Sequence, residues 1–113
     1  MNIKSFIVAL MSNTMIVEGA VLQLYSGPGC TGATEFRNVY DNTCATGVMG
    51  FQSYMITSGG GGGQSITTYS RDACAGTTYS CVSAGDVGPC NNSFGNNFSG
   101  SNAVSSGPSC GVS

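Results

Sequence analysis

Hydrophobic and polar residues alternate along two short stretches of the chain, residues 21–26 (VLQLYS) and 65–70 (SITTYS). An alternation with a period of two is typical of a strand that buries one face, and Thr and Tyr favour this structure. Further strands are predicted at 34–40, 51–57, 77–83 and 98–105. Since no segment has the period of an amphipathic helix, the chain is expected to be all-β, with four short strands in each half.

The strands belong to an internal repeat. Residues 25–34 and 69–78 share the pattern Tyr-Ser-x-x-x-Cys-x-Gly-x-Thr at an offset of 44. Residues 53–59 and 101–107 match at an offset of 48. The difference between the two offsets is expected to lie in the loops that precede these two stretches. A doubled pattern of this kind predicts two copies of one supersecondary unit.

The chain has room for one domain, which is expected at residues 20–113. Repeat 1 covers about 20–59 and repeat 2 about 64–110, and the glycine run at 59–63 is expected to be a flexible connector. Residues 1–19 are interpreted as a signal peptide, because Lys4 precedes an apolar stretch and small residues follow. A retained N-terminal strand or helix is the alternative. No other stretch is apolar over the length of a membrane span.

The charged residues are few, with three Lys+Arg against five Asp+Glu and no His. Nucleic-acid binding is excluded because it needs clustered basic residues. Catalysis is not expected either, since His, the usual general base, is missing. The carboxylates after residue 20 are expected to be solvated turn or surface groups: Glu35, Asp41, Asp72 and Asp86.

Six cysteines lie after the expected signal peptide. An even number in a short exported chain predicts three disulfides, and a secreted, extracellular protein. No Cys-x-x-Cys pair occurs, so zinc or a redox-active dithiol is not indicated.

The order of these motifs resembles the two Greek-key repeats of a βγ-crystallin domain, including small secreted microbial and fungal members of the killer-toxin-like and metalloproteinase-inhibitor-like kinds. In that family an aromatic residue usually stands two positions before the turn glycine, and Cys30 and Cys74 take its place here. The resemblance implies a βγ-crystallin-like sandwich stapled by three disulfides. Another disulfide-rich Greek-key sandwich or barrel remains the alternative.

If the two halves are equivalent, the resemblance implies the disulfides Cys30–Cys44 and Cys74–Cys90. The remaining pair, Cys81–Cys110, would then attach the C-terminal tail to the domain. This is one of about 15 connectivities that six cysteines allow.

The resemblance also raises the question of calcium. Many microbial members bind calcium through the pattern [Asn/Asp]-[Asn/Asp]-x-x-[Ser/Thr]-Ser, and residues 96–101 (NNFSGS) offer Asn96, Asn97 and Ser101 as ligands. Gly100 removes one ligand hydroxyl and no carboxylate lies in the stretch, although calcium prefers them. The alternative is that both Asn residues only form a loop. No other cofactor is indicated.

Two glycosylation triplets occur, at Asn91 and Asn97. Loops rich in Asn, Ser and Tyr are typical of adaptable binding surfaces, so partner binding is expected at these positions: Arg37, Asn38, Tyr40, Asp41, Asn42, Asp86, Asn91 and Asn92. The alternative is that they only keep the protein soluble.

We therefore expect a non-enzymatic binding protein whose partner is a protein or a carbohydrate on a cell surface or in the extracellular medium. The resemblance implies a toxin-like or effector protein, or an inhibitor of a secreted hydrolase. Three alternatives stay open: a carbohydrate-binding protein, a ligand of an animal membrane receptor such as a taste-active protein, and a structural or storage protein.

Overall fold

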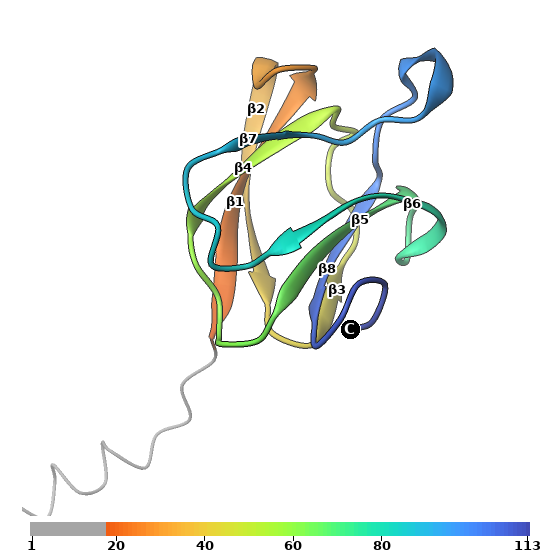
Figure 1. Cartoon of the computed structure of the whole chain (residues 1–113). Coiled ribbons are helices and arrows are strands. Elements are labelled where there is room, and N and C mark those ends of the chain that lie inside the picture. The colour runs from red at the N-terminus through yellow and green to blue at the C-terminus, as the bar shows by residue number, and fades with distance from the viewer. Residues whose placement is uncertain (1–17) are drawn as a thin grey trace, which may run out of the picture.

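The computed structural model describes residues 18–113 as two antiparallel four-stranded sheets packed face to face (Figure 1). The predicted all-β sandwich with three disulfides is confirmed. The strands are β1 Gly19–Gly27, β2 Thr31–Tyr40, β3 Thr43–Ala45, β4 Ser53–Ser58, β5 Ser65–Arg71, β6 Ala75–Ser83, β7 Cys90–Asn92 and β8 Ala103–Gly107.

The predicted signal peptide lies outside the described residues up to position 17, and β1 begins at Gly19, the last residue of that prediction. In the part of the chain that the structure describes, no helix has the length and apolar character needed to span a membrane.

The two repeats exchange their third strands. Sheet A has the order β2-β1-β4-β7 and sheet B the order β3-β8-β5-β6. In each repeat the fourth strand returns to pair with the first, as in a Greek key, while the third strand joins the sheet of the other repeat. Neither sheet is therefore complete without both repeats.

Strand pairing also fixes how the repeats correspond. Leu24 pairs with Tyr54 and Thr68 pairs with Val104, so the last strands correspond at an offset of 50. The predicted offset of 48 is wrong by two residues. It rests on the identities of Ser53, Ser58 and Gly59 with residues 101, 106 and 107, whereas the strands that pair in the same way have no identical residues at an offset of 50. A shift of two keeps the same side chains facing inward.

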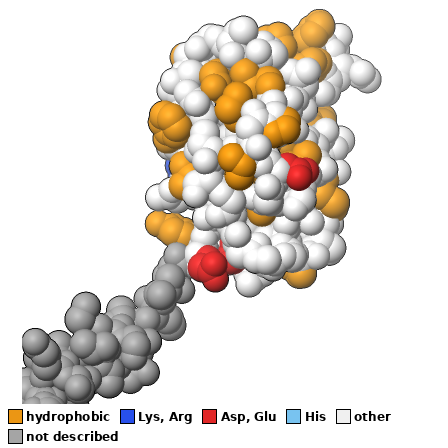
Figure 2. All heavy atoms as spheres, turned by 60° about the vertical axis from the view of Figure 1, so that its left-hand side comes forward, with side chains coloured by type: hydrophobic (Ala, Val, Ile, Leu, Met, Phe, Trp, Pro, Cys, Tyr) orange, Lys and Arg blue, Asp and Glu red, His pale blue; other side chains and the backbone are white. Residues whose placement is uncertain are grey.

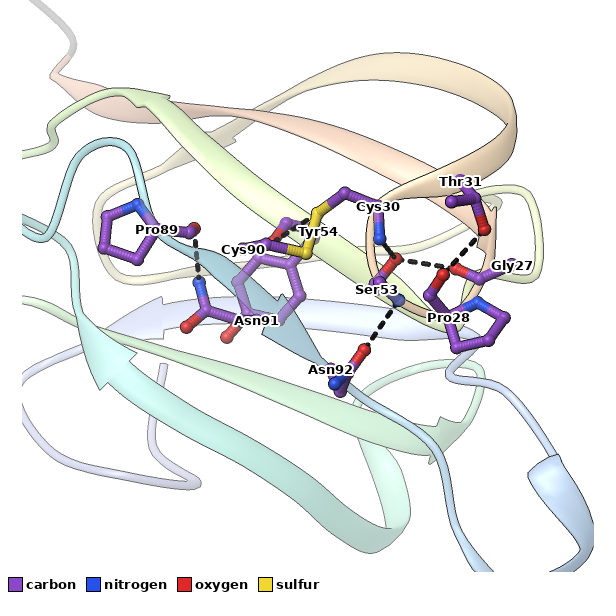
Figure 3. Close-up of a disulfide and its surroundings, with 11 residues drawn as sticks. Gly27, Pro28, Cys30, Thr31, Ser53, Tyr54, Pro89, Cys90, Asn91 and Asn92 are labelled. Atoms are coloured by element: carbon purple, nitrogen blue, oxygen red, sulfur yellow. Dashed lines mark hydrogen bonds between the residues drawn. A yellow bond between two sulfur atoms is a disulfide. The ribbon is translucent and has the colours of Figure 1, made fainter.

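Two of the three predicted disulfides are wrong. The structure pairs Cys30 with Cys90 and Cys44 with Cys74, with Cα atoms 6.0 and 6.1 Å apart. The reason is the strand exchange, since each third strand carries its cysteine to the other sheet. Figure 3 shows the first of these bonds, beside Ser53 and Tyr54. The pair Cys81–Cys110 is formed as predicted.

The shared pattern Ser-x-x-x-Cys-x-Gly builds the same hairpin twice. The Ser26 hydroxyl accepts a hydrogen bond from the Ala33 N–H at 2.9 Å, and Ser70 accepts one from Thr77 at 2.8 Å. Each Ser side chain lies where a Cβ of the turn glycine, Gly32 or Gly76, would be. Glycine is therefore required at both positions for space as well as for its positive φ.

The core lies between the sheets, and its large apolar side chains come mainly from repeat 1. They include Leu22, Leu24, Val39, Phe51, Tyr54 and Ile56, whereas repeat 2 adds Ile66, Val104 and several buried hydroxyl groups. The Tyr54 hydroxyl lies 2.8 Å from the Ser80 hydroxyl. Burial raises the pKa of Tyr54 to about 12, although the hydrogen bond to Ser80 opposes the rise.

Candidate functional site

Residues 93–100, between β7 and β8, project from the sandwich as a small hairpin, which we call the finger (Figure 1, blue, upper right). Phe94 and Gly100 form an antiparallel bridge at its base. The Gly95 N–H donates to the Ser99 carbonyl at 2.9 Å, and the Phe98 N–H donates to the Gly95 carbonyl at 3.1 Å. A single 3-10 turn, Asn96–Phe98, closes the tip.

Buried hydroxyl groups fix the root of the finger to sheet B. The Ser93 side chain hydrogen-bonds the hydroxyls of Thr68 and Ser101, the latter at 2.6 Å. All three residues are fully buried. Phe51 and Ser101 exchange backbone hydrogen bonds of 3.0 and 2.7 Å across the junction of the repeats. Because satisfied buried networks hold one geometry, the finger leaves the core in a defined direction.

The tip presents an aromatic side chain to solvent. Phe98 is 63% exposed, and its ring centroid lies 5.2 Å from that of Phe94. Asn97 and Phe98 both have positive φ, 67° and 59°. Asn adopts this conformation readily, but a bulky residue does so at a cost of about 1–3 kcal/mol. Residues held in sparsely populated backbone conformations cluster at functional sites, so the position of Phe98 makes the tip a candidate site.

Contacts from strand β6 and from the residue before β4 support the finger. The Gln52 side-chain amide, just before β4, donates to the Phe98 carbonyl. On β6, the Tyr79 hydroxyl lies 3.4 Å from the Ser99 hydroxyl, and the Tyr79 ring lies so close to Gly95 that a Cβ there would meet it at 2.7 to 2.8 Å. The backbone at the tip is therefore held from both sides.

The finger carries no charge of its own. No Asp, Glu, Lys or Arg occurs from Val87 to Ser113. Its polar groups are side-chain amides and hydroxyls, so the surface suits a partner site that is itself uncharged and offers an apolar recess for an aromatic ring.

The predicted binding residues do not form one site. Asp41 and Asn42, in the β2–β3 turn, contact the glycine run and the residue after it. The Gly61 N–H donates to Asp41 at 3.1 Å, and Asn42 exchanges hydrogen bonds of 3.1 Å with the Gln64 side chain. Arg37 is half-buried, donates to the Thr46 carbonyl and lies 3.9 Å from Glu35.

The remaining predicted residues are spread over the surface. Asn38, Tyr40 and Asp86 are exposed. On β7, Asn91 donates to the Pro89 carbonyl at 3.3 Å, and Asn92 accepts from the Gly29 N–H at 2.8 Å. Asn92 is thus already engaged in holding the β1–β2 hairpin.

The predicted calcium ligands lie in different surroundings. Asn96 and Asn97 are exposed in the finger, whereas Ser101 is fully buried and donates its hydroxyl proton within the Ser93 network. Among the described residues, no group of three or more His, Cys, Asp or Glu side chains lies together. Of the two glycosylation triplets, Asn97 is exposed at the tip and Asn91 is half-buried on β7.

Three aromatic residues of this site, Phe94, Phe98 and Tyr79, were not singled out by the sequence. The predicted strand 98–105 placed Phe98 in the sheet, but β8 begins at Ala103. The stretch FGNNFSG contains two glycines and two asparagines, which are typical of a turn. That composition is the signal that distinguishes the finger from a strand.

Comparison of the chain with models of known families, with curated proteins and with solved structures gives no significant match.

Proposed function

We propose that this protein is a secreted, non-enzymatic binding protein of the βγ-crystallin-like type, and that it recognises a partner protein with the finger. The exposed Phe98 on its hydrogen-bonded base is the observation that carries the proposal. A toxin-like or effector protein, or an inhibitor of a secreted hydrolase, would use such a projection to enter a recess of its target.

The energetics favour this assignment. An aromatic anchor that enters a partner pocket typically contributes 2 kcal/mol or more to binding, which is about a 30-fold change in affinity. Because the base of the finger is already ordered, little conformational entropy is lost on binding. The strand exchange and the three disulfides also support a scaffold that keeps its shape outside the cell.

The variant Phe98→Asn tests the proposal, because Asn tolerates the positive φ of Phe98 and leaves the fold intact. The oxidised protein is immobilised and offered surface and secreted proteins of candidate target cells, and captured proteins are quantified for each variant. The matched control is Val87→Ser, which removes another exposed apolar side chain, 51% exposed, outside the finger. We expect a protein that is captured by wild type and Val87→Ser, and lost with Phe98→Asn. Equal capture by Phe98→Asn would contradict the proposal.

Carbohydrate binding is the second candidate, because Asn96 and Asn97, which precede Phe98 in the chain and are exposed, carry amide groups that suit sugar hydroxyls. A glycan array distinguishes these two candidate functions. Glycan binding that disappears with Phe98→Asn would indicate that the partner is a carbohydrate and not a protein.

A further inference from the structure

The outer side of strands β1 and β2 carries three aromatic side chains. Leu24 and Val39 are fully buried between the sheets. Because side chains alternate along a strand, the outward positions are those of Tyr25, Phe36 and Tyr40. Phe36 and Tyr40 are 62% and 46% exposed, and Tyr25 is half-buried. We call this surface the aromatic face, and it lies at the edge of sheet A, where β2 is the last strand.

Side-chain amides lie between the rings. The strand register pairs Gln23 directly with Phe36, and it pairs Tyr25 with the residue two positions before Phe36. Tyr25 and Phe36 are therefore diagonal neighbours on one face. On β2, Asn38 is exposed and stands on the same side as Phe36 and Tyr40, midway between them. Rings and amides thus alternate along the aromatic face.

The charged side chains of β2 point to the opposite side of the strand. Arg37 and Glu35 stand two and four positions before the buried Val39, on the same side of the strand. Arg37 donates to the Thr46 carbonyl and lies 3.9 Å from Glu35. The outward positions 21, 23 and 25 of β1 and 34, 36, 38 and 40 of β2 are all uncharged. The side of the molecule at the left of Figure 1, where β1 and β4 lie, has hydrophobic side chains at its surface and few charged ones (Figure 2).

An aromatic ring beside amide groups suits a sugar. A pyranose ring presents C–H groups on one face, which stack on the electron-rich face of an aromatic ring. Its hydroxyl groups lie around the rim and hydrogen-bond to amides, which both donate and accept. An uncharged face gives no advantage to an anionic polymer. The core of a homodimer interface is usually more apolar than a surface with Gln23 and Asn38 at its centre.

We propose that the aromatic face binds a neutral polysaccharide that lies along β2. Phe36 and Tyr40 stack on sugar rings, and Gln23 and Asn38 bind the hydroxyl groups between them. Phe36 and Tyr40 are four strand positions apart, which is about 13 Å. This distance exceeds the length of one sugar residue, so the ligand is a chain of several sugars. The proposal goes beyond the function of the finger, because the aromatic face belongs to repeat 1 and the finger to repeat 2.

Sedimentation with insoluble neutral polysaccharides provides the test. The oxidised protein is mixed with particles of cellulose, chitin or β-1,3-glucan, and the bound fraction is measured over a range of protein concentrations. We expect retention by at least one of the three, and competition by soluble oligosaccharides of the same sugar. Phe36→Thr should weaken binding at least tenfold and Tyr40→Thr severalfold, since Thr keeps the strand but removes the ring. Val87→Ser, which removes an exposed apolar side chain elsewhere, should bind like wild type.

The variant Asn38→Val distinguishes sugar recognition from non-specific adsorption. Valine favours a strand and makes the aromatic face more apolar, so hydrophobic adsorption to the particles would become stronger. Loss of an amide that binds sugar hydroxyls should instead weaken binding severalfold. Melting temperatures under non-reducing conditions show that each variant is folded, as expected for the exposed Phe36 and Asn38.

Four results would overturn the proposal. The first is retention by none of the three polysaccharides. The second is retention that Phe36→Thr leaves unchanged or that Asn38→Val increases. The third is loss of retention with Phe98→Asn while Phe36→Thr binds like wild type, which would place the sugar on the finger. The fourth is a concentration-dependent dimer that Phe36→Thr abolishes, because the aromatic face would then be covered by a second copy of this chain.

Discussion

The two β-hairpins differ at one strained position, and exchanging the residues there should change stability in opposite directions. Ala73, in the β5–β6 turn, has a φ of 62°, and Gly29, its counterpart in the β1–β2 turn, has a φ of 66°. A Cβ in this left-handed region costs about 1–2 kcal/mol. Glycine also lowers stability by about 0.4–1 kcal/mol relative to alanine, because it gives the unfolded chain greater conformational freedom. We therefore expect Ala73→Gly to stabilise the protein by about 0.5–1 kcal/mol, and Gly29→Ala to destabilise it by a similar amount.

Steric overlap does not complicate the comparison, because a Cβ at Gly29 would meet no atom within 4 Å. Urea and thermal unfolding under non-reducing conditions measure both variants, and for a domain of this size the expected change is about 2–8 °C in Tm. Ala75→Gly is the control, since Ala75 is also exposed but lies in a strand, where glycine should cost stability. If Ala73→Gly and Ala75→Gly shift the Tm in the same direction, backbone strain at Ala73 does not determine the stability of this turn.

Three further predictions concern the core, the hairpin and the disulfides. Because the pKa of Tyr54 is raised to about 12, the folded state holds a proton that the unfolded state loses above pH 10, so stability falls as pH rises. The loss at pH 11 should be about 1.4 kcal/mol in urea unfolding, and Tyr54→Phe should remove this part of the pH dependence; identical slopes for both proteins would contradict it. Gly76→Ala should cost about 2 kcal/mol or more in the same assay, because the new Cβ overlaps the Ser70 hydroxyl at a positive φ; a neutral result would mean that the serine moves aside freely. Trypsin has two sites in residues 18–113, after Arg37 and Arg71, and digestion of the denatured, unreduced protein should leave all three fragments covalently joined. A separate fragment beginning at residue 72 would instead indicate pairing within the repeats.

The alternation of residues and the repeat predict most of the strands. The stretches 21–26 and 65–70 lie in β1 and β5, and the shared Tyr-Ser pattern marks the hairpins that follow them. β3 and β7 were not predicted as strands, because three residues are too few for a period of two to be seen. Their cysteines were recognised, but the sheet that each short strand joins is decided by long-range pairing.

The candidate site was predicted less well than the fold. Polar composition pointed to Asp41, Asn42 and Asn92, yet these side chains hydrogen-bond within the protein. Composition identifies groups that can bind but not those whose hydrogen-bonding capacity is already used. Phe98 was assigned to a strand because aromatic residues favour strands, whereas the surrounding Gly and Asn residues form a turn.

The strand exchange has a consequence for how the chain reaches this structure. During synthesis, Cys30 and Cys44 emerge before either of their partners, Cys90 and Cys74. The two early cysteines are near neighbours in sequence, so a premature oxidant would join them to each other. Correct folding thus requires oxidation to wait until the second repeat has been made, or an isomerase to undo that first bond. We expect the yield of active protein to depend on the redox conditions of folding more strongly than its final stability does.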